Sequence, residues 1–196
     1  GLRAWAVCSV VIFHFFPSVV PFGFMGVDVF FVLSGFLIVL AMDNTHGNLR
    51  SFCFKRVRRI FPLMLLIIFS LLMCILFHNN TDYSRYNTRS AVKSMLCVKN
   101  VVQRDNGEEY FRMLEEAYDL FTHMWSLSVE IQYYCIAPII LVIRKRLTQC
   151  YILPYLSTIS AYSLLVFISL SPETAFNSTI ARLWQFSMGA FVYELR

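Results

Sequence analysis

The chain has 196 residues, of which 58% are hydrophobic and only 15% are charged. An ordinary soluble domain carries about 25% charged residues, so this composition excludes a typical water-soluble globular protein. The formal net charge of +5 resides in short segments between apolar runs, which favours membrane topology and anionic head groups over a nucleic-acid partner.

Six apolar runs follow one another along the chain. A helix that crosses the hydrocarbon part of a bilayer, about 30 Å thick, needs about 20 apolar residues. Inside lipid only a helix or a closed barrel satisfies every backbone polar group, and the sequence lacks the alternating pattern of barrel strands. The runs therefore predict an all-α fold, a polytopic transmembrane helix bundle, with helices at about 4–22, 24–42, 60–77, 125–143, 151–170 and 183–192.

The basic residues between the runs predict the orientation of the chain. Arg3 opens the chain, a cluster of Lys and Arg lies at 50–59, and another follows the fourth run at 144–146. By the positive-inside rule these segments are cytoplasmic, which places residues 78–124 and 171–181 outside the cell or in a lumen. We therefore expect an integral multi-pass protein of the plasma membrane or an endomembrane, with a cytoplasmic N-terminus.

The external segment at 78–124 mixes acidic and basic residues, so it offers no basic patch for nucleic acid. Apolar residues at helical spacing between Glu108 and Leu120 predict an amphipathic helix on the membrane surface. Asn79 and Asn177 each lie in a glycosylation sequon within segments predicted to be external.

Cysteine and histidine spacing gives no sign of a metal centre. The six cysteines include no CxxC pair, and Cys97 is the one that falls clearly in the external segment. We therefore expect no structural metal and no bound cofactor.

Three ionisable residues lie inside apolar runs: His14, Asp28 and Glu130. Such groups cost about 2.5–3.5 kcal/mol at the centre of a bilayer on insertion scales, so they indicate a functional site. Counted from the predicted helix ends, all three lie in the outer half of the membrane, where a carboxylate could orient His14 as a general base. Alternatively, His14 only forms a hydrogen bond to a neighbouring helix. Pro17 is expected to kink the first helix beside it.

The basic cluster at 55–59 directly precedes the third run. A guanidinium group binds phosphate oxygens in a bidentate manner, so Arg56 and Arg59 could hold a nucleotide-bearing donor such as a coenzyme A thioester at the inner face. The alternative is that the cluster is only a topology signal.

Four motifs in order along the chain carry a family resemblance. They are Arg3, ten residues and His14; GVDVFFVLSGFLI at 26–38; Arg56 and Arg59 in an RxxR arrangement; and WSLSVE at 125–130. Together they resemble the acyltransferase-3 family of integral membrane O-acyltransferases. A further stretch from Arg182 resembles the start of a later family helix, but Gln185 stands where an acidic residue is common, so no charged role is extended to it.

The resemblance implies an enzyme that moves an acyl group, often acetyl, from cytoplasmic acyl-CoA as cosubstrate to a hydroxyl of a carbohydrate or lipid acceptor across the bilayer. His14 would be the essential histidine with Arg3 as its partner, and Arg56 and Arg59 would be the donor-side arginines. Family members resemble bundles of ten helices, so we expect this chain to be the N-terminal part of such a domain.

The external segment, with its sequons and Cys97, resembles the animal branch of the family, including nematode relatives of the nose-resistant-to-fluoxetine proteins. For that branch two other functions stay open: movement of a lipid or small molecule, and a non-catalytic membrane scaffold. A transporter would show flux without chemistry, and a scaffold would tolerate the loss of His14.

Overall fold

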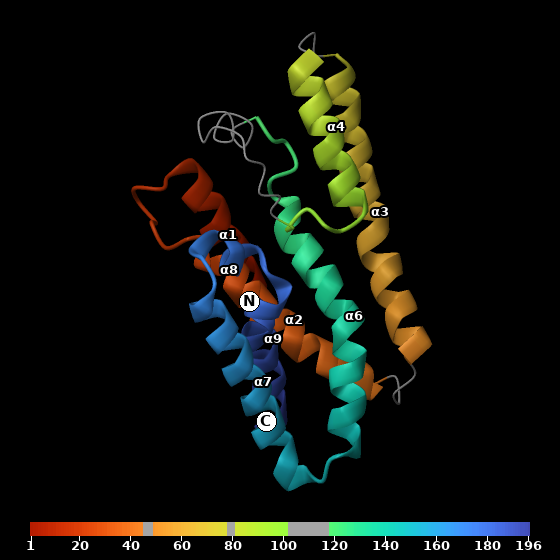
Figure 1. Ribbon diagram of the computed structural model, residues 1–196, viewed down its shortest axis with the longest axis vertical. Helices are drawn as coiled ribbons and strands as arrows, with labels where there is room; N and C mark the ends of the chain where they lie inside the picture. Colours follow the sequence, from red (N-terminus) through yellow and green to blue (C-terminus); the bar gives the residue numbers. More distant parts are fainter. Residues whose placement is uncertain (45–48, 78–80, 102–117) are drawn as a thin grey trace. The chain divides into compact units, whose positions relative to one another are not determined.

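The computed structural model describes residues 1–44, 49–77, 81–101 and 118–196, and the regular structure in these ranges is helical (Figure 1). The chain divides into two compact units, each of which is described by itself. Unit 1 comprises Gly1–Leu49 with Cys135–Arg196, and unit 2 comprises Arg50–Tyr134. The all-α class predicted from the sequence is confirmed.

The helices are α1 (Leu2–Phe15), α2 (Met25–Asn44), α3 (Leu49–Leu76), α4 (Thr81–Met95), α6 (Met124–Arg146), α7 (Gln149–Ser169), α8 (Pro172–Asn177) and α9 (Thr179–Glu194). Within the described ranges, α2, α6, α7 and the Phe54–Leu76 part of α3 are long and apolar enough to cross a bilayer. The other two predicted spans correspond to shorter helices, since α1 has 14 residues and α9 has 16. The pattern is that of a polytopic membrane bundle.

The first helix ends at Phe15, seven residues before the predicted end at 22. A proline disfavours the helical conformation of the residue before it and has no N–H to donate. Phe16, directly before Pro17, accordingly leaves the helix with φ −137° and ψ 64°. Pro17 therefore ends α1 instead of kinking a longer helix.

The third helix begins at Leu49 and not at 60, so the arginine cluster is helical rather than part of a loop. The apolar pattern could not reveal this, because the first turns of the helix are polar. Lys and Arg are good helix formers, and their charged ends can reach water from a helix surface. Arg56 and Arg59, three positions apart, lie on neighbouring turns of α3.

Two further segments differ from the prediction. The external segment contains α4, a polar helix that the apolar pattern did not mark. The amphipathic helix expected between Glu108 and Leu120 lies mostly outside the described residues, and its last three positions, 118–120, form a turn. The sixth predicted helix, 183–192, is the longer α9, and the short α8 precedes it.

In unit 1, glycines set the contacts between helices. Gly26 of α2 lies against Ala6 and Val10 of α1, and Gly35 lies against the backbone of Phe186 in α9. Gly189 of α9 approaches the α2 backbone in the same way. A Cβ atom at either Gly35 or Gly189 would overlap the partner backbone, so α2 and α9 cross where each has a glycine.

One end of unit 1 carries a network of charged side chains. Arg144 of α6 donates two hydrogen bonds to Asp43 of α2, at 3.1 and 3.3 Å, and forms an ion pair with Glu194 of α9. The Tyr193 hydroxyl donates to Asp43 at 3.0 Å. Because Arg144 is 8% exposed, its charge is balanced within the protein, and the pairs fix α2, α6 and α9 at this end.

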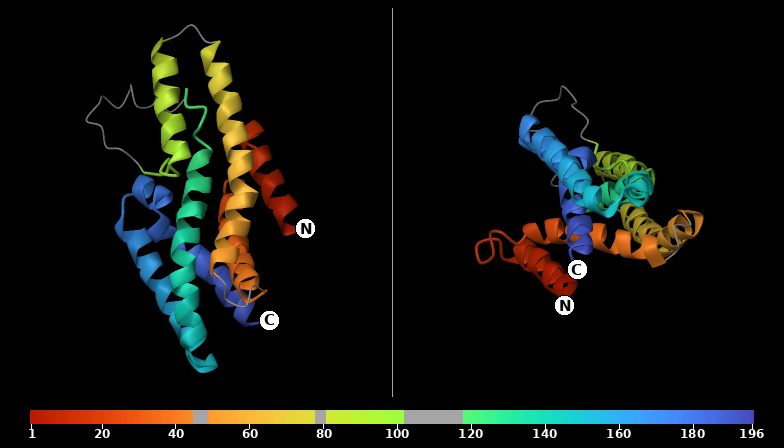
Figure 2. Two further views of the ribbon diagram at one scale, coloured as in Figure 1. Left: turned by 90° about the vertical axis from the view of Figure 1, so that its right-hand side faces the viewer. Right: turned by 90° about the horizontal axis from the view of Figure 1, so that it is seen from below.

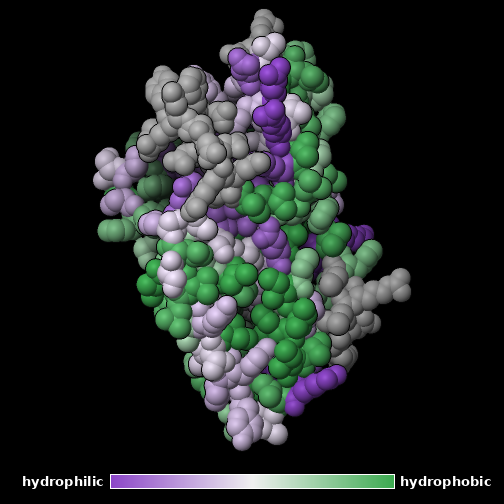
Figure 3. Space-filling view, viewed as in Figure 1, coloured by the Kyte–Doolittle hydropathy of each residue, from purple (hydrophilic) through white to green (hydrophobic). Residues whose placement is uncertain are grey.

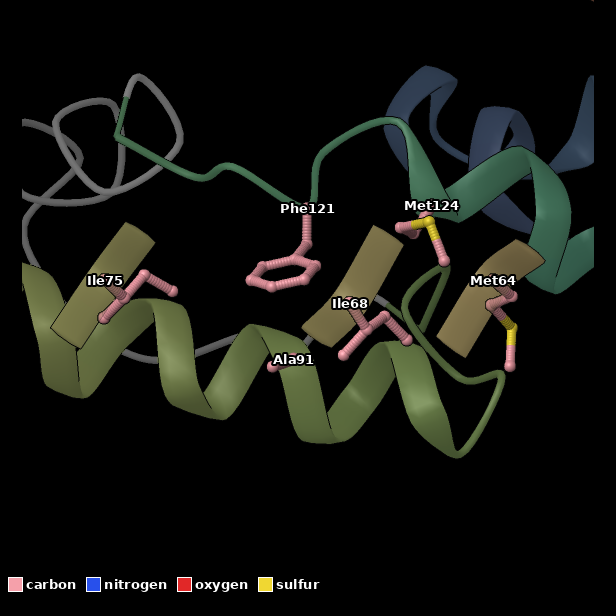
Figure 4. Packing of buried hydrophobic residues seen from close by; sticks show 6 residues of the cluster. All are labelled: Met64, Ile68, Ile75, Ala91, Phe121 and Met124. Carbon is pink, nitrogen blue, oxygen red and sulfur yellow. The ribbon is translucent and has the colours of Figure 1, made fainter. Parts of the chain in front are cut away.

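In unit 2, α3 and α4 lie side by side in both Figure 1 and the left view of Figure 2. Figure 4 shows the ring of Phe121, in the turn before α6, directed at the apolar side chains of α3 and α4. This core consists of Met64, Ile68, Ile75, Ala91, Phe121 and Met124. The core holds the start of α6 beside Met64, part of the way along α3.

The polar face of α4 fixes the turn before α6. Asn87 is fully buried, its side-chain amide donates to the carbonyl of Tyr118 at 3.1 Å, and its carbonyl accepts from the N–H of Leu120 at 3.0 Å. Lys99 and Asp119 form an ion pair beside it. Figure 3 shows hydrophilic residues along α4 beside hydrophobic surface over α3, so α4 presents a polar side next to an apolar span.

Candidate functional site

Arg3 and His14 share one side of α1. They are eleven positions apart, close to three helical turns, so they point in nearly the same direction about 16 Å apart along the axis. Both side chains are exposed, and both flank the stripe of Ala6 and Val10 that contacts α2. The spacing noted in the sequence therefore corresponds to a shared face of a helix.

Asp28, in the first turn of α2, faces α9. Its Oδ1 accepts a hydrogen bond at 2.8 Å from Nη1 of Arg182, which is only 3% exposed. Arg182 also donates to the carbonyl of Phe176 at 2.5 Å and to Oε1 of Gln185 at 3.3 Å. The ion pair therefore joins the start of α2 to α8 and α9.

The hydrogen-bond partner of Asp28 within the described residues is thus Arg182 and not His14. The sequence singled out Asp28 as a carboxylate inside an apolar run but gave no role to Arg182. Arg182 lies at the start of a predicted span, where a basic residue is ordinary, and 154 positions separate it from Asp28. Sequence spacing alone gives no signal for such a pair.

Arg56 and Arg59 lie on α3, in unit 2. Arg56 is half-buried: its Cζ lies 5.7 Å from the ring centre of Phe52 and 5.4 Å from that of Tyr134 in α6. A cation over an aromatic ring gains about 0.5–2 kcal/mol, and the two rings restrict where the guanidinium can go. Arg59 is exposed one turn later.

Glu130 belongs to the same group of contacting side chains, called here the Tyr134 assembly, which consists of Phe52, Arg56, Glu130 and Tyr134. The hydroxyl of Tyr134, one turn further along α6, donates a short hydrogen bond to its carboxylate. The face of the Tyr134 ring therefore carries the Arg56 cation while its edge holds the Glu130 anion. The structure brings together an arginine of the RxxR motif and the carboxylate of the WSLSVE motif through a tyrosine that the sequence analysis had not selected.

The level of Glu130 relative to Arg56 differs from the one that the sequence predicts. The sequence places Glu130 near the external face and Arg56 at the cytoplasmic face. In unit 2, however, α6 begins beside Met64 and passes Arg56 only ten residues later. Because α3 begins at Leu49 and α6 begins part of the way along it, the two groups lie at one level.

The opposite face of α6 holds part of the external segment. Gln132 donates to the backbone carbonyl of Cys97 at 2.8 Å and exchanges hydrogen bonds with the Asn100 side chain at 2.8 and 3.1 Å. Gln132 thus fixes residues 97–100 against the helix that carries Glu130. The sequence analysis assigned no role to Gln132.

The six predicted site residues are divided between the two units. Arg3, His14 and Asp28 belong to unit 1, whereas Arg56, Arg59 and Glu130 belong to unit 2. Across the residues that the structure describes, no three His, Cys, Asp or Glu side chains gather in a way that could hold a metal ion.

The comparisons with known proteins agree with these motifs. The whole chain, residues 1–196, matches the family described as the acyltransferase domain. YrhL of Bacillus subtilis (strain 168), whose name marks it as a candidate peptidoglycan O-acetyltransferase, is 34% identical over 148 residues, which are 73% of this chain and 23% of that protein. The O-acetyltransferase OatA of Staphylococcus aureus (strain NCTC 8325 / PS 47) is 29% identical over 186 residues, 92% of this chain and 30% of that protein. No solved structure gives a significant match.

These relatives are bacterial, so they give no support to the animal branch that the external segment suggested. The chain spans less than a third of the length of either relative. The match over its full length, the apolar helices and the four motifs together identify it as an integral, multi-pass membrane protein that belongs to the acyltransferase-3 family.

Proposed function

We propose that this chain carries the donor site and the general base of a membrane O-acyltransferase. The enzyme would move an acyl group from acyl-CoA in the cytoplasm to a hydroxyl of a carbohydrate or lipid on the other side of the bilayer. The acyl group that we propose is acetyl. Family membership and the O-acetyltransferase names of the relatives support this proposal.

The observation that carries the proposal is the contact of Arg56 with the Tyr134–Glu130 pair in unit 2. A guanidinium group recognises phosphate oxygens with directed hydrogen bonds, which suits the phosphates of coenzyme A. Tyr134 and Phe52 hold the Arg56 cation from two sides, so the position of the cation is set before a donor binds. Arg59, exposed on the next turn of α3, offers a second guanidinium group for phosphate oxygens.

His14 is the group that we assign to proton transfer. Its neutral imidazole would take the proton from the attacking hydroxyl while the hydroxyl oxygen forms a bond to the thioester carbonyl carbon. Collapse of the tetrahedral intermediate breaks the carbon–sulfur bond, and the departing coenzyme A thiolate takes the proton. Arg3 shares the His14 side of α1, so we assign it to donor binding. Asp28 already forms an ion pair with Arg182, so we give it no proton-transfer role.

Two further parts of the proposal, the orientation of the chain in its membrane and its branch of the family, are supported by the sequence alone. The basic clusters support a cytoplasmic N-terminus in the plasma membrane or an endomembrane. The mixed-charge external segment supports the animal branch.

The test uses the full-length protein in membranes with radiolabelled acetyl-CoA, following the label into lipid and glycan fractions. We expect transfer with the wild type, loss with His14→Ala, and a raised KM for acetyl-CoA with Arg56→Gln. Matched controls are His123→Ala, in the turn before α6, and Arg58→Gln, two positions from Arg56 and pointing to another side of α3.

The outcomes separate the competing functions. If well-folded wild-type protein transfers no label from several acyl donors but moves a lipid or small molecule across vesicles, the transport function is correct. If His14→Ala and its control retain equal transfer, the assignment of His14 as base is wrong.

A further inference from the structure

The ion pair of Asp28 with Arg182 combines burial, directed hydrogen bonds and aromatic contacts in unit 1. Arg182 is 3% exposed and Asp28 is about one-third exposed, so the pair lies at the margin of the packed helices. The Arg182 Cζ lies 4.6 Å from the ring centre of Phe176 and 5.6 Å from that of Phe31. The guanidinium is therefore held between two rings while its N–H groups are directed at α2 and α8.

Each contact of Arg182 reaches a different helix. The carboxylate belongs to the first turn of α2, the Phe176 carbonyl lies in α8, and the Gln185 amide lies one turn further along α9. A planar group with five N–H donors can bridge several acceptors at fixed angles. Arg182 thereby sets where α2 begins relative to α8 and α9.

Gln185 is a second, uncharged acceptor for Arg182. Its Oε1 lies 3.3 Å from Nη1 of Arg182, and its side chain is buried. The amide thus supplies a neutral acceptor at a place from which a carboxylate of nearly the same shape could reach the same N–H.

We propose that Asp28 and Arg182 form a structural latch between α2 and α9, in which Asp28 acts as the counter-ion of Arg182 and takes no part in proton transfer. Arg182 is then a positioning residue. The latch requires a negative charge within reach of Arg182, but that charge need not come from Asp28. A carboxylate at position 185 should replace it.

The test is a charge relocation in the full-length protein. Asp28→Asn removes the counter-ion, and Asp28→Asn with Gln185→Glu restores it from α9. We expect the single variant to lower the midpoint of thermal unfolding in detergent by about 5–10 °C, since breaking a buried pair leaves its partner charged and unpaired. The double variant should regain at least half of that loss. Gln185→Glu alone places a second buried carboxylate beside an already paired Arg182, so it should also lower the midpoint, and the double variant should be more stable than either single variant. The exposed Glu173→Gln is the control and should shift the midpoint by less than about 2 °C.

Measuring acyl transfer in the same variants distinguishes a structural role of Asp28 from a catalytic one. Only this measurement rests on the proposed function. If the double variant regains both stability and transfer, Asp28 is a counter-ion. If it regains stability but transfers no label while the wild type does, Asp28 is a catalytic carboxylate and the proposal is wrong. Failure to regain stability overturns the latch whatever the activity. An inactive wild type would contradict the proposed function, and the stability arm would still decide the latch.

Discussion

At the scale of single residues, Tyr134 makes two contacts that together require a tyrosine at position 134, one through its ring to Arg56 and one through its hydroxyl to Glu130. A phenylalanine could present a ring to Arg56 but could not donate to Glu130. Without its donor, the half-buried carboxylate of Glu130 would lose a hydrogen bond to a charged group, which is worth about 1.5–3 kcal/mol. Tyr134 thus has the Arg56 cation over the face of its ring and the Glu130 carboxylate at its hydroxyl.

The first prediction concerns Tyr134→Phe. The variant keeps the ring beneath Arg56 but removes the hydroxyl, so donor binding should be preserved and the position of Glu130 should not. Because Glu130 is one of the carboxylates predicted to take part in catalysis, we expect kcat for acyl transfer to fall by about 10–100-fold with KM for acetyl-CoA within about twofold. Tyr151→Phe, at a tyrosine that is 63% exposed on α7, is the matched control. A raised KM with unchanged kcat would show that the hydroxyl serves donor binding.

The second prediction concerns the buried amide of Asn87. Asn87→Ala leaves the Tyr118 carbonyl and the Leu120 N–H without their partner, and each unpaired buried group costs about 1–3 kcal/mol. Thermal unfolding of the full-length protein should show a clear loss of stability. Thr88→Ala, at the next position on the exposed side of α4, should be nearly neutral, because the Thr88 hydroxyl bonds only within its own helix. Equal stability of both variants would show that the hydrogen bonds of Asn87 do not stabilise the turn before α6.

At the scale of helices, unit 1 depends on close approach of backbones. Lipid chains are as apolar as leucine, so helices in a membrane gain little from burying apolar surface and associate through tight packing and polar contacts. The crossing of α2 and α9 uses both. Glycines at 35 and 189 let the backbones meet, and the Asp28–Arg182 pair joins the two helices on one side of the crossing. On the other side, Arg144 of α6 pairs with Asp43 of α2 and with Glu194 of α9.

The third prediction tests that crossing. Gly35→Ala and Gly189→Ala each place a methyl group against backbone atoms of the other helix, which cannot move aside as a flexible side chain could. We expect each substitution to lower the free energy of unfolding by about 1–3 kcal/mol or more. Gly1→Ala is the control, since nothing lies within 4 Å of a Cβ atom at that position. Wild-type stability of both crossing variants would show that α2 and α9 do not approach as described.

At the scale of the whole molecule, the distribution of basic residues predicts which segments face the cytoplasm. Cys97 follows α4 in the segment predicted to be external, and Cys150 lies at the start of α7, next to a predicted cytoplasmic loop. Both thiols are at least partly accessible in the structure, so their reactivity can report the side of the membrane on which they lie.

The fourth prediction uses these cysteines one at a time, in a background in which the others are replaced. In intact cells, a membrane-impermeant maleimide should label Cys97 and should leave Cys150 unlabelled until the membrane is opened. Cys74, in the apolar span of α3, serves as a control that should react slowly in both conditions, because a water-soluble reagent does not enter the hydrocarbon layer. Labelling of Cys150 before Cys97 would reverse the predicted orientation.

The sequence by itself determined the membrane class, the helical fold, the family and the motifs, because hydropathy and motif spacing are local properties of the chain. It misplaced the end of α1 and the start of α3, since an apolar pattern marks contact with lipid and not where hydrogen bonding of the backbone begins or ends. Only the tertiary structure decided the partners of the charged groups. Asp28 meets Arg182, and Glu130 reaches Arg56 through Tyr134, because side chains far apart in sequence are brought together by how the helices pack.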